Sequence, residues 1–453
     1  LLVVGFVAPA SAASPTFEPP TATSTFGKEI VFTQPFVSPF ALARVELLLE
    51  YPDSLGPYVV QVAGATAAGS HELLHRRSLA DDGHIVPNTP ITARWRLVPA
   101  DRTLEPVIGT PVTVTYADTR FVWKTLQGDI VRLHWYQGSE AFGRRALEIG
   151  ETAVREAAAF LGVTESERID FFVYAGQGDF YDALGPGTRE NVGGEAHSDI
   201  RTMFALIGPG DVADPWVGVV IPHELAHLVF DTAVRNPYHF PPRWLNEGVA
   251  TYLSEGFTPS DRAAVAAAAA SARLMPLRAL GGQFPTTYER FSLAYAESVS
   301  AVDYLVREKG TESLVKLIRS YANGVTDDEA FTAAVGNDLA GFEAAWLADL
   351  GAAPPTEHGP LAAPAGPLPP GWEADATPAP PNASPGPGAS PGASPDGSPA
   401  PGPGGQTDDG GSPLRDGWLL VIVALAGLLV GGTLAYVRRR SRNGAGGGEG
   451  QKS

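Results

Sequence analysis

The chain has 453 residues, which is enough for two or three domains, and 44% of them are hydrophobic, as a normal buried core requires. Acidic residues outnumber basic ones by 50 to 32, for a net charge of −18. Such a charge argues against a nucleic-acid partner, because binding to phosphates depends on clustered Lys and Arg. The chain contains no Cys, so disulfides, thiolate metal sites and thiol catalysis are excluded. Any bound metal must therefore be held by His and carboxylate side chains.

The first segment, residues 1–13, is apolar and ends in small residues, "LLVVGFVAPASAA", with an A-x-A pattern at Ala10–Ala12. This pattern predicts the remnant of a secretory signal peptide, cleaved near Ala12 or Ala13. The alternative is an unstructured apolar terminus.

Residues 24–121 alternate apolar and polar side chains in short runs such as "KEIVFTQPF", "ARVELLLEY" and "ITARWRLV", separated by turn residues. Strands at this spacing predict a small β-sandwich. The module contains one H-E-x-x-H pattern, His71 to His75 in "GSHELLHRRS". Its flanks have no apolar helical face, so we interpret these residues as exposed polar side chains on a strand or loop.

Residues 122–351 follow a different order. "DIVRLHWYQ" and "RIDFFVYAG" read as strands on either side of a helical run, and "RTMFALIG" reads as a further strand after a Gly-rich loop. From Asp214 onward the periodicity is helical. A mixed sheet lobe followed by a helical lobe predicts an α+β domain.

A second H-E-x-x-H pattern lies in this domain, in "VIPHELAHLVF". Apolar residues surround His223 and His227, which predicts a buried helix, and His at i and i+4 share one helical face. Burying two His and Glu224 in a helix costs free energy unless these side chains are paired or bind a metal. Nineteen residues separate His227 from Glu247, in "PPRWLNEGVATYL", which predicts a return helix that carries a third ligand. The alternative is a core helix with hydrogen-bonded His side chains.

H-E-L-A-H followed by W-L-N-E-G resembles the gluzincin metallopeptidases of the peptidase MA clan, in particular their aminopeptidase-N-like and thermolysin-like catalytic domains. The resemblance implies one Zn²⁺ per chain, held by His223, His227 and Glu247, with Glu224 as the general base. It also implies that Tyr295, in "LAYAESVSAVDYL", stabilises the oxyanion; the alternative is a Tyr that only packs. The implied activity is hydrolysis of peptide bonds by zinc-activated water, and the implied partner is a peptide or protein.

The sequence also departs from the aminopeptidases. Their G-x-M-E-N segment, whose Glu binds the substrate's amino terminus, is replaced here by "NVGGEAHSDI", which offers Glu195 without the motif. Specificity for free amino termini is therefore left open. We interpret His197 as an exposed loop residue and expect "DIRTMFALIG" to be the edge strand that pairs with an extended substrate. A catalytically silent surface binding or adhesion module is the alternative function.

Residues 352–416 are dominated by Pro, Gly, Ala and Ser and predict a disordered stalk. Residues 418–437, "WLLVIVALAGLLVGGTLAYV", form an uncharged run of 20 residues, long enough for one transmembrane helix. The basic tail, 438–453, begins "RRRSR", which predicts a cytoplasmic tail and an extracytoplasmic head in a single-pass protein of the cell membrane. Gly427 and Gly431 form a G-x-x-x-G that would allow weak pairing of two such helices.

Overall fold

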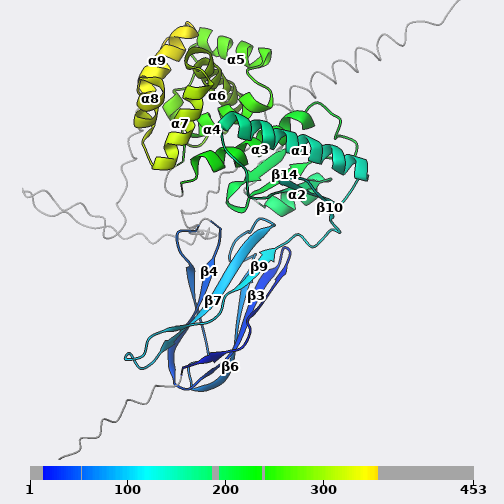
Figure 1. Cartoon of the computed structure of the whole chain (residues 1–453), viewed down its shortest axis with the longest axis vertical. Helices are drawn as coiled ribbons and strands as arrows, with labels where there is room; N and C mark the ends of the chain where they lie inside the picture. The colour runs from blue at the N-terminus through cyan, green and yellow to red at the C-terminus, as the bar shows by residue number, and fades with distance from the viewer. Residues whose placement is uncertain (1–13, 53, 186–192, 237–239, 356–453) are drawn as a thin grey trace, which may run out of the picture. The chain divides into compact units, whose positions relative to one another are not determined.

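The computed structural model describes residues 14–52, 54–185, 193–236 and 240–355 (Figure 1). The predicted signal segment, the stalk from residue 356 onward, the transmembrane helix with Gly427 and Gly431, and the basic tail lie outside the described residues.

The N-terminal part folds into two antiparallel sheets. In the first, β3 pairs with three other strands. Its strands are β1 (Thr16–Phe17), β2 (Thr21–Thr25), β3 (Glu29–Ser38) and β6 (Gly69–Ser78). The second has β4 and β7 at its centre. Its strands are β4 (Leu42–Glu50), β5 (Tyr58–Val62), β7 (Thr89–Pro99), β8 (Val107–Ile108) and β9 (Val112–Tyr116).

The two sheets share one hydrophobic core, as a sandwich requires. Every second residue of β7 points inward, from Ile91 through Ala93 and Trp95 to Leu97, and all four are fully buried. This is the period of two that places alternate side chains of a strand on one face. The sheets begin earlier than the expected boundary at residue 24, because β1 already pairs with β3.

A third sheet lies in the second part of the chain. Its order is β10-β11-β12-β14-β13, in which the three inner strands run parallel and the two outer ones antiparallel. The strands are β10 (Lys124–Gln127), β11 (Val131–Trp135), β12 (Ile169–Tyr174), β13 (Gly194–His197) and β14 (Thr202–Leu206). The expectation that "DIRTMFALIG" forms the edge was wrong. β13, read from sequence as loop, occupies the edge, and β14 lies inside the sheet.

Two long helices, α1 (Glu140–Leu161) and α3 (Val217–Val234), pack against each other and against strands of this sheet (Figure 1). α1 begins where the Ser139 side chain accepts a hydrogen bond from the Phe142 backbone N–H, and it ends at Gly162, whose φ of 64° suits glycine. Gly150 allows close packing, because a Cβ there would lie 3.4 Å from Leu225 on α3.

The remaining α-helices form the helical lobe. They are α4 (Arg243–Ser254), α5 (Pro259–Ala270), α6 (Tyr288–Lys309), α7 (Thr311–Ser320), α8 (Asp327–Val335) and α9 (Leu339–Asp349); the short α2 (Gln177–Leu184) belongs to the sheet lobe. α4 and α6 approach closely at Gly248, where a Cβ would come within 2.5 Å of the Ser298 carbonyl oxygen. The predicted α+β class is confirmed.

Within the described ranges, α3 is the one helix with the length and hydropathy of a membrane span. About 72% of that segment is buried inside the protein, so its apolar character is that of a core helix.

Candidate metal centre

α3 presents two imidazoles on one face. Nearly all sides of this helix are buried. Pro222 is its sixth residue. His223 and His227 are 1% and 2% exposed, and their ring centroids lie 4.8 Å apart. The helical repeat of 3.6 residues places the two rings one turn apart and pointing to the same side.

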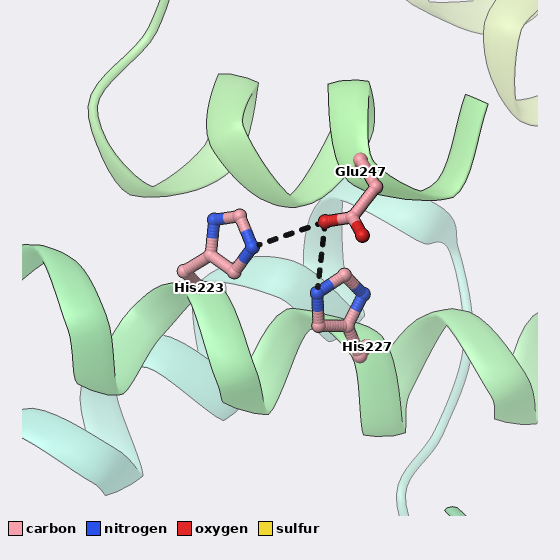
Figure 2. A group of neighbouring side chains, drawn as sticks. All are labelled: His223, His227 and Glu247. Atoms are coloured by element: carbon pink, nitrogen blue, oxygen red, sulfur yellow. Dashed lines mark ion pairs between the residues drawn. The ribbon is translucent and has the colours of Figure 1, made fainter. Parts of the chain in front are cut away.

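α4 supplies a carboxylate opposite these rings. Glu247 is fully buried, and its Oε2 lies 3.5 Å from Nε2 of His223 and 3.7 Å from Nε2 of His227. Figure 2 shows the carboxylate reaching from one helix toward the two rings on the other. Among the residues that the structure describes, this is the one group of three potential metal ligands whose donor atoms lie within 4.8 Å of one another.

The donor atoms fit a zinc ion. Two His and one Glu leave one coordination position open, as in catalytic zinc sites. Bonds of about 2.1 Å in tetrahedral geometry put donor atoms about 3.4 Å apart, close to the two distances observed here. Nε2 of both His side chains and Oε2 of Glu247 are also buried without a hydrogen-bond partner. Leaving such atoms unpaired costs roughly 1–3 kcal/mol each, so the geometry favours a bound cation.

The protonation states suit metal binding. Burial, followed by the charge of His223, lowers the pKa of His227 to about 4, so its ring is neutral at pH 7. Burial opposes ionisation of Glu247, but the His223 ring 3.5 Å from its Oε2 and the charges of Arg243 and the two His side chains outweigh burial. The pKa of Glu247 therefore lies below its ordinary value. A neutral imidazole and an ionised carboxylate are the forms that bind metals.

Glu224 lies between the two His residues in sequence and is fully buried. Neither of its carboxylate oxygens has a hydrogen-bond partner of ordinary geometry. Burial raises the pKa of Glu224 well above its usual value, and the charges of Glu247 and Glu195 add to this, while the backbone N–H of Ala196 on β13 opposes it. A carboxylate with a raised pKa, directed toward the edge strand, is suited to exchanging a proton.

Tyr295 lies well inside α6. Its ring packs on Phe284 and Phe291, at centroid distances of 5.4 and 5.1 Å. Burial, followed by the charge of Glu247, raises the pKa of Tyr295 well above its ordinary value, and its hydroxyl hydrogen-bonds with Glu247 and Arg243. Tyr295 therefore adjoins the metal ligands as a protonated donor.

Two polar residues that the sequence analysis did not single out contact the ligands. Nδ1 of His227 lies 2.9 Å from Oδ1 of Asn246, which orients the ring so that Nε2 faces Glu247. Nε of Arg243 donates to Oε1 of Glu247 at 3.1 Å. Both precede Glu247 in "RWLNE", by one and by four residues; the spacing of four is one helical turn and was the available signal.

The interpretation of His197 as an exposed loop residue was wrong. It lies on β13 with 14% side-chain exposure, and its Nε2 lies 2.7 Å from Oε1 of Glu195. The Glu195 side chain is 1% exposed. The His197 imidazole therefore already contacts the carboxylate that the resemblance to the aminopeptidases suggested as an anchor for amino termini.

The first H-E-x-x-H pattern has a different geometry, because it lies on strand β6. On a strand, residues four apart are separated by about 13 Å, too far for one ion. The His71 ring stacks on Phe36 at 5.3 Å, and its Nε2 lies 2.9 Å from the Ala67 carbonyl oxygen. His75 is half-buried on the same strand.

The chain was compared with family models, solved structures and curated proteins. Residues 150–352 match the family model of the Peptidase MA superfamily. The chain is similar to solved structures of an M1 zinc metallopeptidase from Deinococcus radiodurans, with 13% identity, a TM-score of 0.35 and coverage of 74% of this chain and 94% of that one. An aminopeptidase N family protein from Idiomarina loihiensis has 10% identity, a TM-score of 0.38 and coverage of 70% and 73%. No curated protein matches the sequence.

The matched region contains both helices of the candidate metal centre and the whole helical lobe. The resemblance seen in "HELAH" and "WLNEG" and the family model, which rests on the wider sequence, thus agree on the same segment. The region from residue 150 to 352 belongs to the Peptidase MA superfamily.

Proposed function

We propose that this protein is a zinc metallopeptidase that hydrolyses peptide bonds, with His223, His227 and Glu247 as metal ligands and Glu224 as general base. The observation that carries the proposal is the convergence of buried polar atoms without hydrogen-bond partners. They are both ring nitrogens of His223, both carboxylate oxygens of Glu224, Nε2 of His227 and Oε2 of Glu247. A purely structural core would leave these atoms uncompensated, at a cost of several kcal/mol.

Zinc, when bound, lowers the pKa of a coordinated water to about 7 and polarises a carbonyl oxygen. Glu224 would accept a proton from the attacking water. Its raised pKa makes it a stronger base than an exposed carboxylate and lets it hold the proton until the C–N bond begins to break. Glu224 would then donate that proton to the nitrogen as the amine leaves.

Tyr295 is proposed to donate its phenolic proton in a hydrogen bond to the developing oxyanion. Its raised pKa keeps it protonated at neutral pH. Because its hydroxyl bonds with Glu247 and Arg243 here, this role requires it to exchange that bond for one to the substrate.

We propose that an extended substrate pairs with β13. The outer edge of this strand has no strand partner among the described residues, and the backbone N–H of Ala196 faces Glu224. A substrate strand added there would place its backbone beside the proposed base. Cleavage between internal residues and cleavage at the amino terminus are both compatible with this position.

We further propose that the catalytic head is extracytoplasmic and anchored by residues 418–437, with the tail 438–453 in the cytoplasm. The support is the uncharged run and the Arg residues that follow it. Weak pairing through Gly427 and Gly431 belongs to the same proposal. Protease treatment of intact cells should digest the head and spare the tail; a protected head would contradict this orientation.

Zinc stoichiometry tests the catalytic proposal. We expect one zinc per chain in the wild type and in His71→Ala, and none in His223→Ala, measured by elemental mass spectrometry on folded protein. Glu224→Gln should retain zinc but lower kcat on a cleaved peptide by about 10²–10⁴-fold, because it removes only the base. Full proteolysis by Glu224→Gln, or zinc lost on changing His71 instead of His223, would contradict the proposal.

The second candidate function is a surface binding module that retains the peptidase fold without activity. The Glu195–His197 pair favours this alternative, because the acidic side chain on the edge strand, Glu195, already has a partner. One zinc per chain, combined with no cleavage across a diverse peptide library, would support this alternative.

A further inference from the structure

Arg243 is a buried cation beside the candidate metal ligands. It is the first residue of α4, one helical turn before Glu247, and it is 6% exposed. Its Nε donates to Oε1 of Glu247 at 3.1 Å. Charged side chains are almost never fully buried unless they are paired, so the pair must be explained either by stability or by the function of the site.

The two carboxylate oxygens of Glu247 face different groups. Oε1 of Glu247 is taken by Arg243, whereas Oε2 lies 3.5 and 3.7 Å from the Nε2 atoms of His223 and His227 and has no hydrogen-bond partner. Rotating the carboxylate by a quarter turn would break the hydrogen bond to Arg243 and turn the second oxygen away from the imidazoles. The guanidinium therefore fixes the plane in which the free oxygen faces the two rings.

Arg243 is itself fixed by three other contacts. Its backbone N–H donates to the carbonyl oxygen of Gly281 at 2.8 Å, and its guanidinium lies 4.9 Å from the centroid of the Phe284 ring. Its side chain also hydrogen-bonds with Tyr295 on α6. An arginine held from the backbone, from a ring face and from a phenol has little freedom to follow a moving carboxylate.

Stability alone is a weak explanation for this pair. The cost of removing two charges from water offsets most of their attraction, so buried ion pairs contribute little net free energy of folding. A planar guanidinium does, however, impose a direction on a carboxylate, which a point charge such as Lys imposes less well. The geometry thus points to orientation of the metal ligand.

We propose that Arg243 is a positioning residue that holds Glu247 with Oε2 toward the metal, and that it thereby raises zinc affinity and sets the coordination geometry. This inference rests on the zinc site proposed above. Residues that orient metal ligands typically contribute 10–100-fold to metal affinity.

The test uses the full chain and measures zinc affinity by competition with a chelator, together with the visible absorption of the cobalt-substituted protein, which reports ligand geometry. We expect Arg243→Met to weaken zinc binding by about 10–100-fold and to change the cobalt spectrum. Arg243→Lys, which keeps the charge without the planar fork, should recover part of the affinity but not the wild-type spectrum.

Arg77→Met is the matched control. Arg77 is also buried, at 8% exposure, but it lies in the sandwich, where it donates to the carbonyl oxygens of Asp82 and Gly83. This variant should keep the zinc affinity and cobalt spectrum of the wild type.

Wild-type zinc affinity and an unchanged spectrum in both Arg243 variants would overturn the inference, as would an equal loss of affinity in Arg77→Met. If Arg243→Met does not fold, the cobalt spectrum of Arg243→Lys, compared with that of the wild type, decides the question. A wild-type chain that binds no zinc would instead overturn the proposed function, so the two failures are distinguishable.

Discussion

Gly194 lies against the side chain of Glu224. A Cβ at this position would come 3.2 Å from Oε1 of Glu224 and 2.7 Å from its Cγ, and the second distance is closer than real Cβ contacts allow. The absence of a side chain at Gly194 is therefore what leaves room for the proposed base to lie next to the edge strand.

We expect Gly194→Ala to displace the Glu224 carboxylate and lower kcat by about 10–100-fold, because misplacing a reacting group by about 1 Å has effects of this size. Zinc content should not change, since the three atoms nearest to a Cβ at this position all belong to Glu224, which is not one of the proposed ligands. Steady-state kinetics with zinc analysis measures both quantities. Gly193→Ala is the matched control, because its Cβ would make an ordinary contact with Val220 at 3.6 Å. Equal kcat values in both variants would contradict this account.

At the scale of elements, α6 carries a second buried carboxyl group two residues after Tyr295. Glu297 is fully buried and accepts hydrogen bonds from the Met275 backbone N–H at 3.2 and 3.1 Å. Burial raises the pKa of Glu297 to about 8; the Met275 N–H opposes this and the charge of Glu343 adds to it. α6 therefore carries a group whose protonation is coupled to folding.

The folded protein keeps the Glu297 proton up to about pH 8, whereas the unfolded chain loses it near the ordinary value of 4.5. The stabilisation is thus complete below about pH 4.5 and is lost as pH rises toward 8, with a slope of up to roughly 1.4 kcal/mol per pH unit. We expect Glu297→Gln to remove this part of the slope, as measured by urea unfolding between pH 5 and 8. Exposed Glu312→Gln should leave it unchanged; an identical slope in wild type and Glu297→Gln would show that Glu297 does not titrate in this range.

At the scale of the whole molecule, the described residues form two separate hydrophobic cores, one in the sandwich and one in the peptidase domain. The three candidate ligands belong to α3 and α4, both within the second core. A bound metal would join these two helices and have no direct contact with the strands of the sandwich.

We therefore expect chelation of zinc to lower hydrogen-exchange protection in α3 and α4 and to leave β3, β4 and β7 unchanged, as measured by mass spectrometry of peptides from the full chain. A ligand present at 1,000 times its Kd stabilises the folded state by about 4 kcal/mol. Removing zinc present at that concentration should therefore lower the free energy of unfolding by no more than this amount. In His223→Ala the chelator should have no effect. Equal loss of protection in the sandwich, or the same chelator effect in His223→Ala, would contradict a local zinc site.

The sequence by itself determined the features that depend on local periodicity. The strand alternation of residues 24–121, the helical order after Asp214 and a return helix that carries Glu247 can all be read from side-chain spacing. The motif pair "HELAH" and "WLNEG" indicated the same region that the superfamily model matches, because closely spaced ligands on helices leave a compact signature.

Only the tertiary structure decided which strand forms the edge of the third sheet, and which groups orient the ligands. Strand order depends on pairing between distant segments, so the four residues of β13 could not be separated from a loop by composition. Asn246 looks like an ordinary polar residue in sequence, and its contact with His227 at 2.9 Å exists only because α4 packs against α3. Arg243 and Glu247 lie one turn apart on α4, but only the structure shows that the guanidinium contacts the carboxylate, at 3.1 Å. For the edge strand and for Asn246 the physical reason is the same: a contact between distant segments leaves no periodic trace in either one.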